Sequence, residues 1–369
     1  HIYSTPSPLK GGKCALLDSG KVDLPAIAPG ETGRARMALP ARFFEGDILE
    51  LEACDRNGKS ICTWTWPIKY TAAYFAQQQP AISASKAPVI ENAGAHVILS
   101  ANGIAATFDT ANGMLKEIRR DGQIVPFGNG PLPVGMKADL KSITTRTDGN
   151  DALLIVKYTG ALDTVIWRMT PDGLLGMDAL MLNRGNGGKY KGEFFDKKVY
   201  QLGLTFSYPE KEAKGMRWLG RGPYRVWKNR IPGTNYGIWQ KDYNNTITGE
   251  SFESLAYPEF KGYHANLYWA TIESDTAPFT VYSETDGIYL RVFTPQQPGQ
   301  GTSEEDSMHP FPEGDISFLY DIPAMRSFKS ISEHGPKSQP SSIRIKSGDD
   351  GLRMKLWFDF RNMHSNVAE

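Results

Sequence analysis

VILSANGIAATFDTANGMLKEIRRDG, residues 97–122, is the stretch that decides the fold. It contains three turn dipeptides, Asn102-Gly103, Asn112-Gly113 and Asp121-Gly122, at intervals of about ten residues. Apolar and polar residues alternate between these turns, as they do in strands that bury one face. Short alternating segments joined by such turns predict successive antiparallel hairpins.

The chain beyond residue 122 continues in short strand-like segments. Apolar positions at i, i+3, i+4 and i+7 do not recur over the dozen residues that crossover helices need, so a parallel α/β sheet is disfavoured. A complete (β/α)₈ barrel, which takes about 250 residues, is excluded for the same reason. We predict an all-β chain with one very large antiparallel sandwich. Its later strands are expected at Leu153–Tyr158, Thr164–Met169, Leu174–Met181, Tyr200–Phe206, Phe279–Ser283, Ile288–Phe293, Ile316–Ile322, Ser341–Ile345 and Leu352–Phe360.

The N-terminal part of the chain predicts a second, smaller unit. Alternating segments around Val22, Ala35–Leu39, Ile48–Ala53 and Ile61–Ile68 are separated by turns, at the spacing of a small antiparallel sandwich. The sandwich is expected to be N-terminally incomplete and to cover residues 1–72. Residues 73–88 lack periodicity and predict a linker. The large sandwich is expected over residues 89–362, with a tail at 363–369.

Composition limits the classes of partner. Lys and Arg together number 41, as do Asp and Glu, so no global field would attract nucleic acid or an anionic membrane. A neutral partner fits better. No apolar run approaches the roughly 20 residues that cross a bilayer, and no signal peptide opens the chain. Because it begins with His1, we expect a processed piece of a longer polypeptide.

Cys14, Cys54 and Cys62 are odd in number, which leaves at least one free thiol. A two-residue type I′ turn at Asn57-Gly58 would pair Arg56 with Lys59 and Ala53 with Cys62. In that register Cys54 points to the opposite face from Cys62. A disulfide between strands is therefore not expected.

A further stretch, Met216–Tyr224, combines Trp218, Arg221 and glycine turns, and Tyr257–Tyr263 with the strand-like Ala265–Trp269 adds more aromatic and charged residues. Aromatic faces stack on the apolar faces of pyranose rings, while charged groups bond hydroxyls. The competing interpretation is that most of these rings fill the space between sheets. The carbohydrate-binding candidates are Trp218, Arg221, Tyr224, Trp227, Arg230, Trp239, Glu259, Lys261, His264 and Trp269.

The order W-L-G-x-G-P at 218–223 and P-E-x-x-G at 258–262 resembles the C-terminal part of family 2 glycoside hydrolases of the β-galactosidase type. That resemblance implies an immunoglobulin-like sandwich followed by a galactose-mutarotase-like supersandwich. It also implies an accessory region that supports or edges the active site, with the N-terminal domains of the parent chain, a galactoside-type carbohydrate and a homo-oligomer as partners. The family's catalytic pair lies on its barrel, so no catalytic residue is assigned here.

Three departures from the family pattern concern the elements expected nearest to the catalytic pocket. Tyr224–Arg230 lacks both acids of the family's G-P-x-E-N-Y-x-D-R, and Leu132–Gly135 replaces N-x-W-R-A-P-T-D-N. The late loop Glu333–Ser338 lacks the family's Trp. The resemblance thus supports the scaffold and leaves the contribution to an active site open.

Alternatives stay open at this point. A stand-alone mutarotase or epimerase needs a carboxylate and a histidine near the sugar ring; Glu259 and His264 are the local pair, and His309 or His334 could serve instead. A structural module without a ligand is the third hypothesis. No cofactor is expected, although Glu304–Asp306 and Asp349–Asp350 offer oxygens that suit a structural calcium. Asn183–Lys189 lacks the spacing of a phosphate-binding loop and predicts a hairpin loop.

Overall fold

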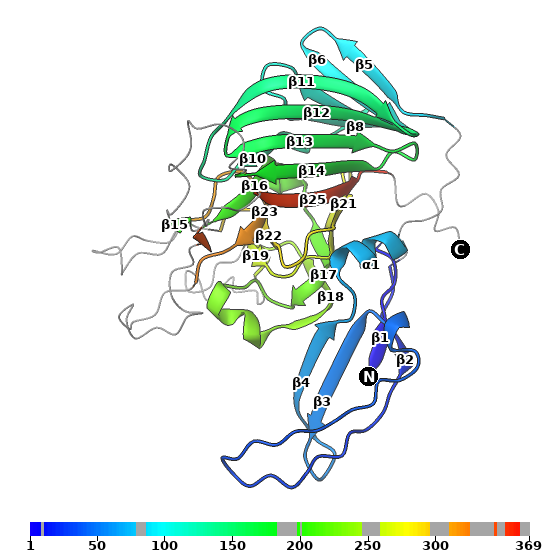
Figure 1. Cartoon of the computed structure of the whole chain (residues 1–369), viewed down its shortest axis with the longest axis vertical. Coiled ribbons are helices and arrows are strands. Elements are labelled where there is room, and N and C mark those ends of the chain that lie inside the picture. The colour runs from blue at the N-terminus through cyan, green and yellow to red at the C-terminus, as the bar shows by residue number, and fades with distance from the viewer. Residues whose placement is uncertain are drawn as a thin grey trace, which may run out of the picture.

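The computed structural model describes residues 1–8, 11–78, 86–182, 201–245, 259–295, 310–324 and 351–361, together with the backbone of two short strands, β15 (Lys198–Val199) and β24 (Ile343–Arg344). Two large antiparallel sheets lie face to face, and a small sheet and one helix lie beside them (Figure 1). Every strand pair in the described residues is antiparallel, so the all-β prediction is confirmed. None of the described helices is long and apolar enough to cross a membrane.

The first large sheet has ten strands, in the order β19-β22-β23-β16-β10-β8-β7-β6-β5, with β9 paired to β8. The second has nine strands, in the order β11-β12-β13-β14-β25-β21-β20-β17-β18. The ten-stranded sheet comprises β5 (Val89–Ala93), β6 (His96–Ala101), β7 (Ile104–Asp109), β8 (Leu115–Arg120), β9 (Gln123–Val125), β10 (Gly128–Pro133), β16 (Leu202–Ser207), β19 (Gly262–His264), β22 (Tyr289–Val292) and β23 (Ile316–Asp321). The nine-stranded sheet comprises β11 (Ala138–Asp148), β12 (Asp151–Gly160), β13 (Leu162–Met169), β14 (Leu175–Met181), β17 (Gly215–Gly222), β18 (Asn235–Asp242), β20 (Trp269–Glu273), β21 (Phe279–Ser283) and β25 (Leu352–Asp359).

The main core lies between these two sheets and is built from alternate residues of their strands. Phenylalanines dominate its centre: Phe127 stacks on Phe206 with 4.9 Å between ring centroids, and Phe358 lies 5.2 Å from Phe127. Each fully buried aromatic side chain contributes about 1.5–3 kcal/mol of transfer free energy. The interior is therefore the dry layer of a large sandwich.

Two of the three predicted turns of the large sandwich, Asn102-Gly103 and Asp121-Gly122, have positive φ at both positions, as type I′ turns do. At Asn112-Gly113 only Gly113 has positive φ. The Asn57-Gly58 prediction was wrong in detail: Asp55 N–H donates to Lys59 O, so Asp55 rather than Arg56 lies opposite Lys59. A bulge then restores the predicted pairing of Ala53 with Cys62, and all three cysteines are free.

The small sheet has four strands, in the order β2-β1-β3-β4: β1 (Ile2–Ser4), β2 (Ala15–Asp18), β3 (Ile48–Cys54) and β4 (Ser60–Pro67). It forms a single layer in the described residues, so the predicted two-layer sandwich is corrected. The strands expected near Val22 and at Ala35–Leu39 are absent, because residues 19–42 are almost entirely exposed and have no ladder. Pro25, Pro29 and Pro40 remove backbone donors there, which disfavours strand pairing.

A helix, α1 (Thr71–Gln78), occupies the place where the predicted linker was to begin. Its first N–H and the Thr71 hydroxyl both donate to Asp286 Oδ1, at 2.9 and 3.0 Å. Phe75 stacks on Trp357 with 5.3 Å between centroids and an interplanar angle of 19°. The helix is thus packed on the outer side of the nine-stranded sheet (Figure 1). Short 3-10 turns lie at Phe43–Glu45, Glu210–Glu212 and Lys228–Gly233.

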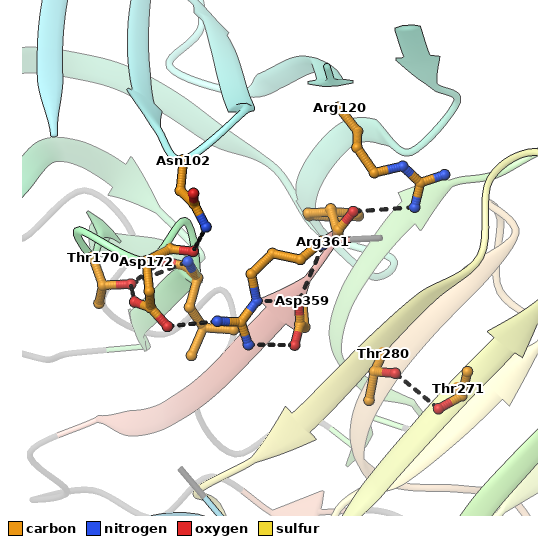
Figure 2. Close-up of polar contacts among 10 residues, drawn as sticks. Asn102, Arg120, Thr170, Asp172, Thr271, Thr280, Asp359 and Arg361 are labelled. Carbon is orange, nitrogen blue, oxygen red and sulfur yellow. Dashed lines mark hydrogen bonds and ion pairs between the residues drawn. The ribbon is translucent and has the colours of Figure 1, made fainter. Parts of the chain in front are cut away.

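An ion-pair cluster joins the end of β25 to the turn between β13 and β14 (Figure 2). The Arg361 guanidinium donates to both oxygens of the fully buried Asp359, at 2.8 and 2.6 Å, and to Asp172 at 2.6 Å. Asn102, in the β6–β7 turn of the other sheet, donates to Asp172 O at 3.0 Å. These contacts fasten the two sheets together at one end of the sandwich.

Candidate functional site

The W-L-G-x-G-P segment forms strand β17 rather than the turns that its glycines indicate. Trp218 is buried in the main core, and its Nε1 donates to Arg221 O at 3.1 Å. Trp269, which the sequence placed at the end of a strand, begins β20; it is buried and donates to Tyr74 Oη at 3.2 Å. Ala265–Tyr268 is a connection and not the predicted strand. Both indoles contribute to packing in this structure.

Gly222, the second glycine of the motif, is explained by the close approach of the Trp239 ring to its backbone. A Cβ on Gly222 would lie 2.5 Å from Trp239 Cδ1, because the β17 backbone lies flat against that ring. Trp239 Nε1 donates to Gly220 O at 3.2 Å. Arg221 donates to Thr234 O at 3.0 Å, and burial lowers the pKa of its guanidinium. These contacts are made within the protein and fix the β17–β18 pair.

The predicted acid-base pair is buried. Glu259 and His264 are 6% and 2% exposed, and Glu259 pairs with Arg225 at 3.4 Å. His264 packs edge-on against Trp218 at 4.9 Å, and its Nε2 lies 3.3 Å from Phe260 O. Burial, with a smaller effect of Arg225, lowers the pKa of His264 to about 4, so the ring is neutral at pH 7. Its Nδ1 has no hydrogen-bond partner among the described residues.

Lys261 is also used in a contact within the protein. Its Nζ donates to Glu210 Oε1 at 3.0 Å, and the Tyr243 hydroxyl donates to the same oxygen at 2.6 Å. Burial and this carboxylate raise the pKa of Tyr243 to about 12. The Glu210 carboxylate thus holds the start of β19 against the end of β18.

Strand alternation puts the residue before His264 on the other side of the sheet. His264 is paired with Leu290, which faces the main core, whereas Tyr263 is paired with Arg291 on the outer face. There Tyr263 stacks on Phe311 at 4.9 Å with an interplanar angle of 18°, and Trp227 packs against both rings at 5.7 and 5.5 Å. We call Trp227, Tyr263 and Phe311 the outer-face cluster. It is the place where a predicted binding residue, Trp227, meets other aromatics away from the main core.

Polar groups border the outer-face cluster. Gln201 Nε2 donates to Tyr263 Oη at 2.9 Å and to Pro310 O at 2.7 Å. Lys228, next to Trp227, donates to the buried Asp321 at 2.6 Å. Tyr289 packs against the cluster half-buried, and burial, then the Asp321 charge, raise the pKa of its hydroxyl to about 12. An amide, an ammonium, a carboxylate and a phenol therefore lie around one group of rings.

Arg291 lies behind the cluster and is fully buried. Its guanidinium donates to Gly314 O and Glu313 O, both at 2.8 Å, and to the hydroxyl of Ser317 at 2.8 Å. Burial lowers its pKa to about 10. By binding these two carbonyls, Arg291 fixes the segment that carries Phe311 against the sheet.

Tyr224 and Arg230 lie in the same connection as Trp227, between β17 and β18; Tyr224 is half-buried and Arg230 is exposed. The sequence did not single out Gln201, Lys228, Tyr289, Phe311 or Asp321. Outward positions can be inferred for Tyr289 from its alternation with buried Leu290 and Val292. Nothing in the sequence says that β22, β23 and the segment after β17 are neighbours.

Several sequence predictions fall outside the described residues: His309, His334, the acidic groups Glu304–Asp306 and Asp349–Asp350, and the Asn183–Lys189 loop. Within the described ranges no group of three or more His, Cys, Asp or Glu residues is arranged to hold a metal ion.

Comparison with solved structures finds chains with a similar fold. The crystal structure of galactose 1-epimerase from Lactobacillus acidophilus NCFM is similar to this chain with a TM-score of 0.38 and 8% sequence identity, over 85% of this chain and 99% of that one. No protein family model matches the sequence. No curated protein matches it either.

Proposed function

We propose that this chain is a carbohydrate-binding accessory region of a family 2 glycoside hydrolase of the β-galactosidase type, and that it binds a galactoside at the outer-face cluster. The observation that carries the proposal is the meeting of Trp227, Tyr263 and Phe311 with the Lys228–Asp321 pair. The motif order at 218–223 and 258–262 supports the family assignment. In this proposal bond cleavage belongs to the parent's barrel.

The chemistry of the cluster suits a neutral sugar. One face of a pyranose ring is apolar and packs on aromatic rings, while its hydroxyls need donors and acceptors around the edge. Lys228 supplies donors, and Asp321 supplies acceptors. Because Asp321 is buried, its hydrogen bonds are stronger than those of an exposed carboxylate. Lys228 and Tyr289 are half-buried, whereas the three rings are 7%, 1% and 6% exposed, so a sugar would meet the cluster at its Lys228 and Tyr289 edge.

Titration with galactose, lactose and longer galacto-oligosaccharides, followed by tryptophan fluorescence and calorimetry, tests the proposal. We expect saturable binding that Trp227→Ala weakens at least about tenfold, a loss of about 1.4 kcal/mol. Asp321→Asn keeps the shape and removes the charge, and should weaken binding in the same direction. Trp66→Phe, on the small sheet, is the matched control and should leave the affinity unchanged. An absence of saturable binding at millimolar sugar would refute the proposal.

The same samples separate the alternatives. Robust hydrolysis of aryl β-galactosides by this chain would contradict an accessory role. Faster decay of the optical rotation of fresh α-galactose, abolished by Glu259→Gln and His264→Ala, would instead favour an epimerase. The motif order at 218–223 and 258–262 is why the accessory role is preferred.

A further inference from the structure

The small sheet directs one face, the inward face, at the large sandwich. Thr65 Oγ1 on this face accepts a hydrogen bond from Tyr236 N–H at 2.5 Å, and Ile48 is buried there in one cluster with Tyr74 and Tyr236. On the same face Glu50 accepts from the Tyr3 hydroxyl at 3.1 Å and contacts His1 Nδ1 at 2.9 Å. In a sheet with one solvated face the apolar residues normally face the protein and the polar ones face water.

The opposite face, here called the outward face, is apolar. Leu51 lies directly across from Trp64, and Leu49 from Trp66, with Ala53 across from Cys62 at the end of the sheet. These six side chains carry no charge. Leu51, Trp64 and Trp66 are 41%, 42% and 38% exposed. A row of large apolar side chains in water on a regular sheet marks an interaction surface.

The apolar exposure is concentrated in this part of the chain. Eleven of the thirteen large hydrophobic residues that are exposed in the described ranges lie between residues 16 and 70. Four of them belong to the strandless segment 19–42: Leu24, Ile27, Met37 and Leu39. That segment has the alternation of strands without a sheet to join. Both observations call for a second apolar layer over the outward face.

A second copy of this chain can supply that layer. Two sheets pack face to face about 10 Å apart with interdigitating side chains, which is how a sandwich is built. A two-fold contact sets each surface against itself, so it is permitted only where like charges do not meet. The outward face meets this condition because its six central side chains are neutral, and the whole chain has no net charge.

The area sets the strength of such a contact. The four strands have 3, 4, 7 and 8 residues, which at about 3.3 Å per residue and about 4.8 Å per strand give roughly 350 Å² of flat face for each copy. Two such faces, about 700 Å² in total, are smaller than the roughly 1,000 Å² of a specific interface. The apolar residues of segment 19–42 add to it. The contact is therefore expected to be reversible and dependent on concentration.

We propose that the outward face of the small sheet is the contact surface between two copies of this chain, which together form a two-layer sandwich. Trp64 and Trp66 are its central residues, because buried aromatic anchors dominate interface energies. The sugar site proposed above lies on a different sheet, so this inference does not depend on it.

Sedimentation equilibrium of the full chain, from about 1 to 100 μM, tests the proposal directly. The wild-type chain is expected to form dimers, with a blue shift of tryptophan emission as the concentration rises. Leu51→Glu and Trp64→Glu should raise the dissociation constant at least about 30-fold. Leu16→Glu is the matched control: Leu16 is also exposed, at 55%, but lies across from Tyr3, in the register of the inward face. It should leave the dimer intact.

Two exposed thiols give a second readout. Cys62 belongs to the outward face, and Cys54 lies beyond the bulge, next to the Asp55–Lys59 turn. Chains that keep only one of these two cysteines, the others being serine, are treated with bis-maleimides of increasing length. Covalent dimers should form with Cys62 at shorter lengths than with Cys54. A chain that stays monomeric over the whole range, or a dimer that survives the outward-face substitutions, overturns the proposal, even if a polysaccharide or another protein then proves to bind there.

Discussion

Arg361→Ala should destabilise the large sandwich more than any exposed ion-pair substitution. Asp359 is fully buried at the end of β25, and the Arg361 guanidinium donates to both of its carboxylate oxygens (Figure 2). The same guanidinium reaches Asp172 in the β13–β14 turn at 2.6 Å. Removing Arg361 therefore leaves one buried carboxylate without its cation and releases a connection between distant turns.

The size of the stability loss on Arg361→Ala follows from the burial of the Arg361–Asp359 pair. Breaking a buried pair by deleting one partner costs about 3–5 kcal/mol, because the remaining charge is uncompensated. Arg361 is 14% exposed at its side chain and Asp359 is not exposed at all, so little of this cost is relieved by water. We expect about 3 kcal/mol for Arg361→Ala. Arg361→Lys keeps the charge and loses the forked geometry, so its cost should fall between that of alanine and zero.

Urea unfolding followed by circular dichroism at neutral pH measures the change. Arg353→Ala provides the matched control. Arg353 lies on β25 and pairs with Asp178 of β14, but its side chain is 54% exposed. Exposed pairs contribute about 0–1 kcal/mol. If Arg361→Ala costs no more than Arg353→Ala, the burial of Asp359 does not have the consequence argued here.

His264 has a pKa of about 4 in the folded chain against 6.5 when unfolded, so the unfolded state binds the proton first and stability falls as pH drops from 6.5 towards 4. Urea unfolding at about pH 7 and about pH 5 should show a loss assignable to this ring of about 2 kcal/mol, which disappears in His264→Gln. Gly222→Ala should lower the free energy of unfolding by about 1–3 kcal/mol, since the added Cβ meets the Trp239 ring at 2.5 Å. Gly233→Ala is the control and should be nearly neutral, because no atom lies within 4 Å of its added Cβ. Equal losses of stability in the two variants would refute the contact at Gly222.

Local signals in the sequence predicted the hairpins of the large sandwich. The Asn102-Gly103 and Asp121-Gly122 turns carry their own backbone requirement, so they are recognisable without a partner. The β17 strand was not recognised, because the glycines of 216–224 indicate turns. Gly222 is required instead by a ring seventeen residues further along, at Trp239. That close packing exists only once β17 and β18 pair, and a single sequence does not contain it.

The prediction of strands in segment 19–42 of the small unit was wrong for a related reason. Alternation at Val22 and Ala35–Leu39 was recognised correctly as a pattern, yet a strand forms only when another strand accepts its hydrogen bonds. The described residues provide no such neighbour for segment 19–42, whereas β3 and β4 have each other and keep the predicted register. Pattern alone predicts which face a strand would bury, and pairing decides whether the strand exists.

Which residues form the candidate site depends on a difference of one position along β19. The charged and aromatic residues between Glu259 and Trp269 led to the prediction of His264 as a site residue. The alternation of side chains along β19 instead places the His264 ring in the core, against Trp218. Its neighbour Tyr263 faces outward and meets Trp227, Phe311 and the polar groups around them. The ionisable pair next to a half-buried phenol is then Lys228–Asp321, from the segment after β17 and the end of β23. If this sheet binds a sugar, the chemistry belongs to residues that the strand order assembles, because β19 brings Tyr263 and β23 brings Asp321 to the connection that carries Trp227 and Lys228.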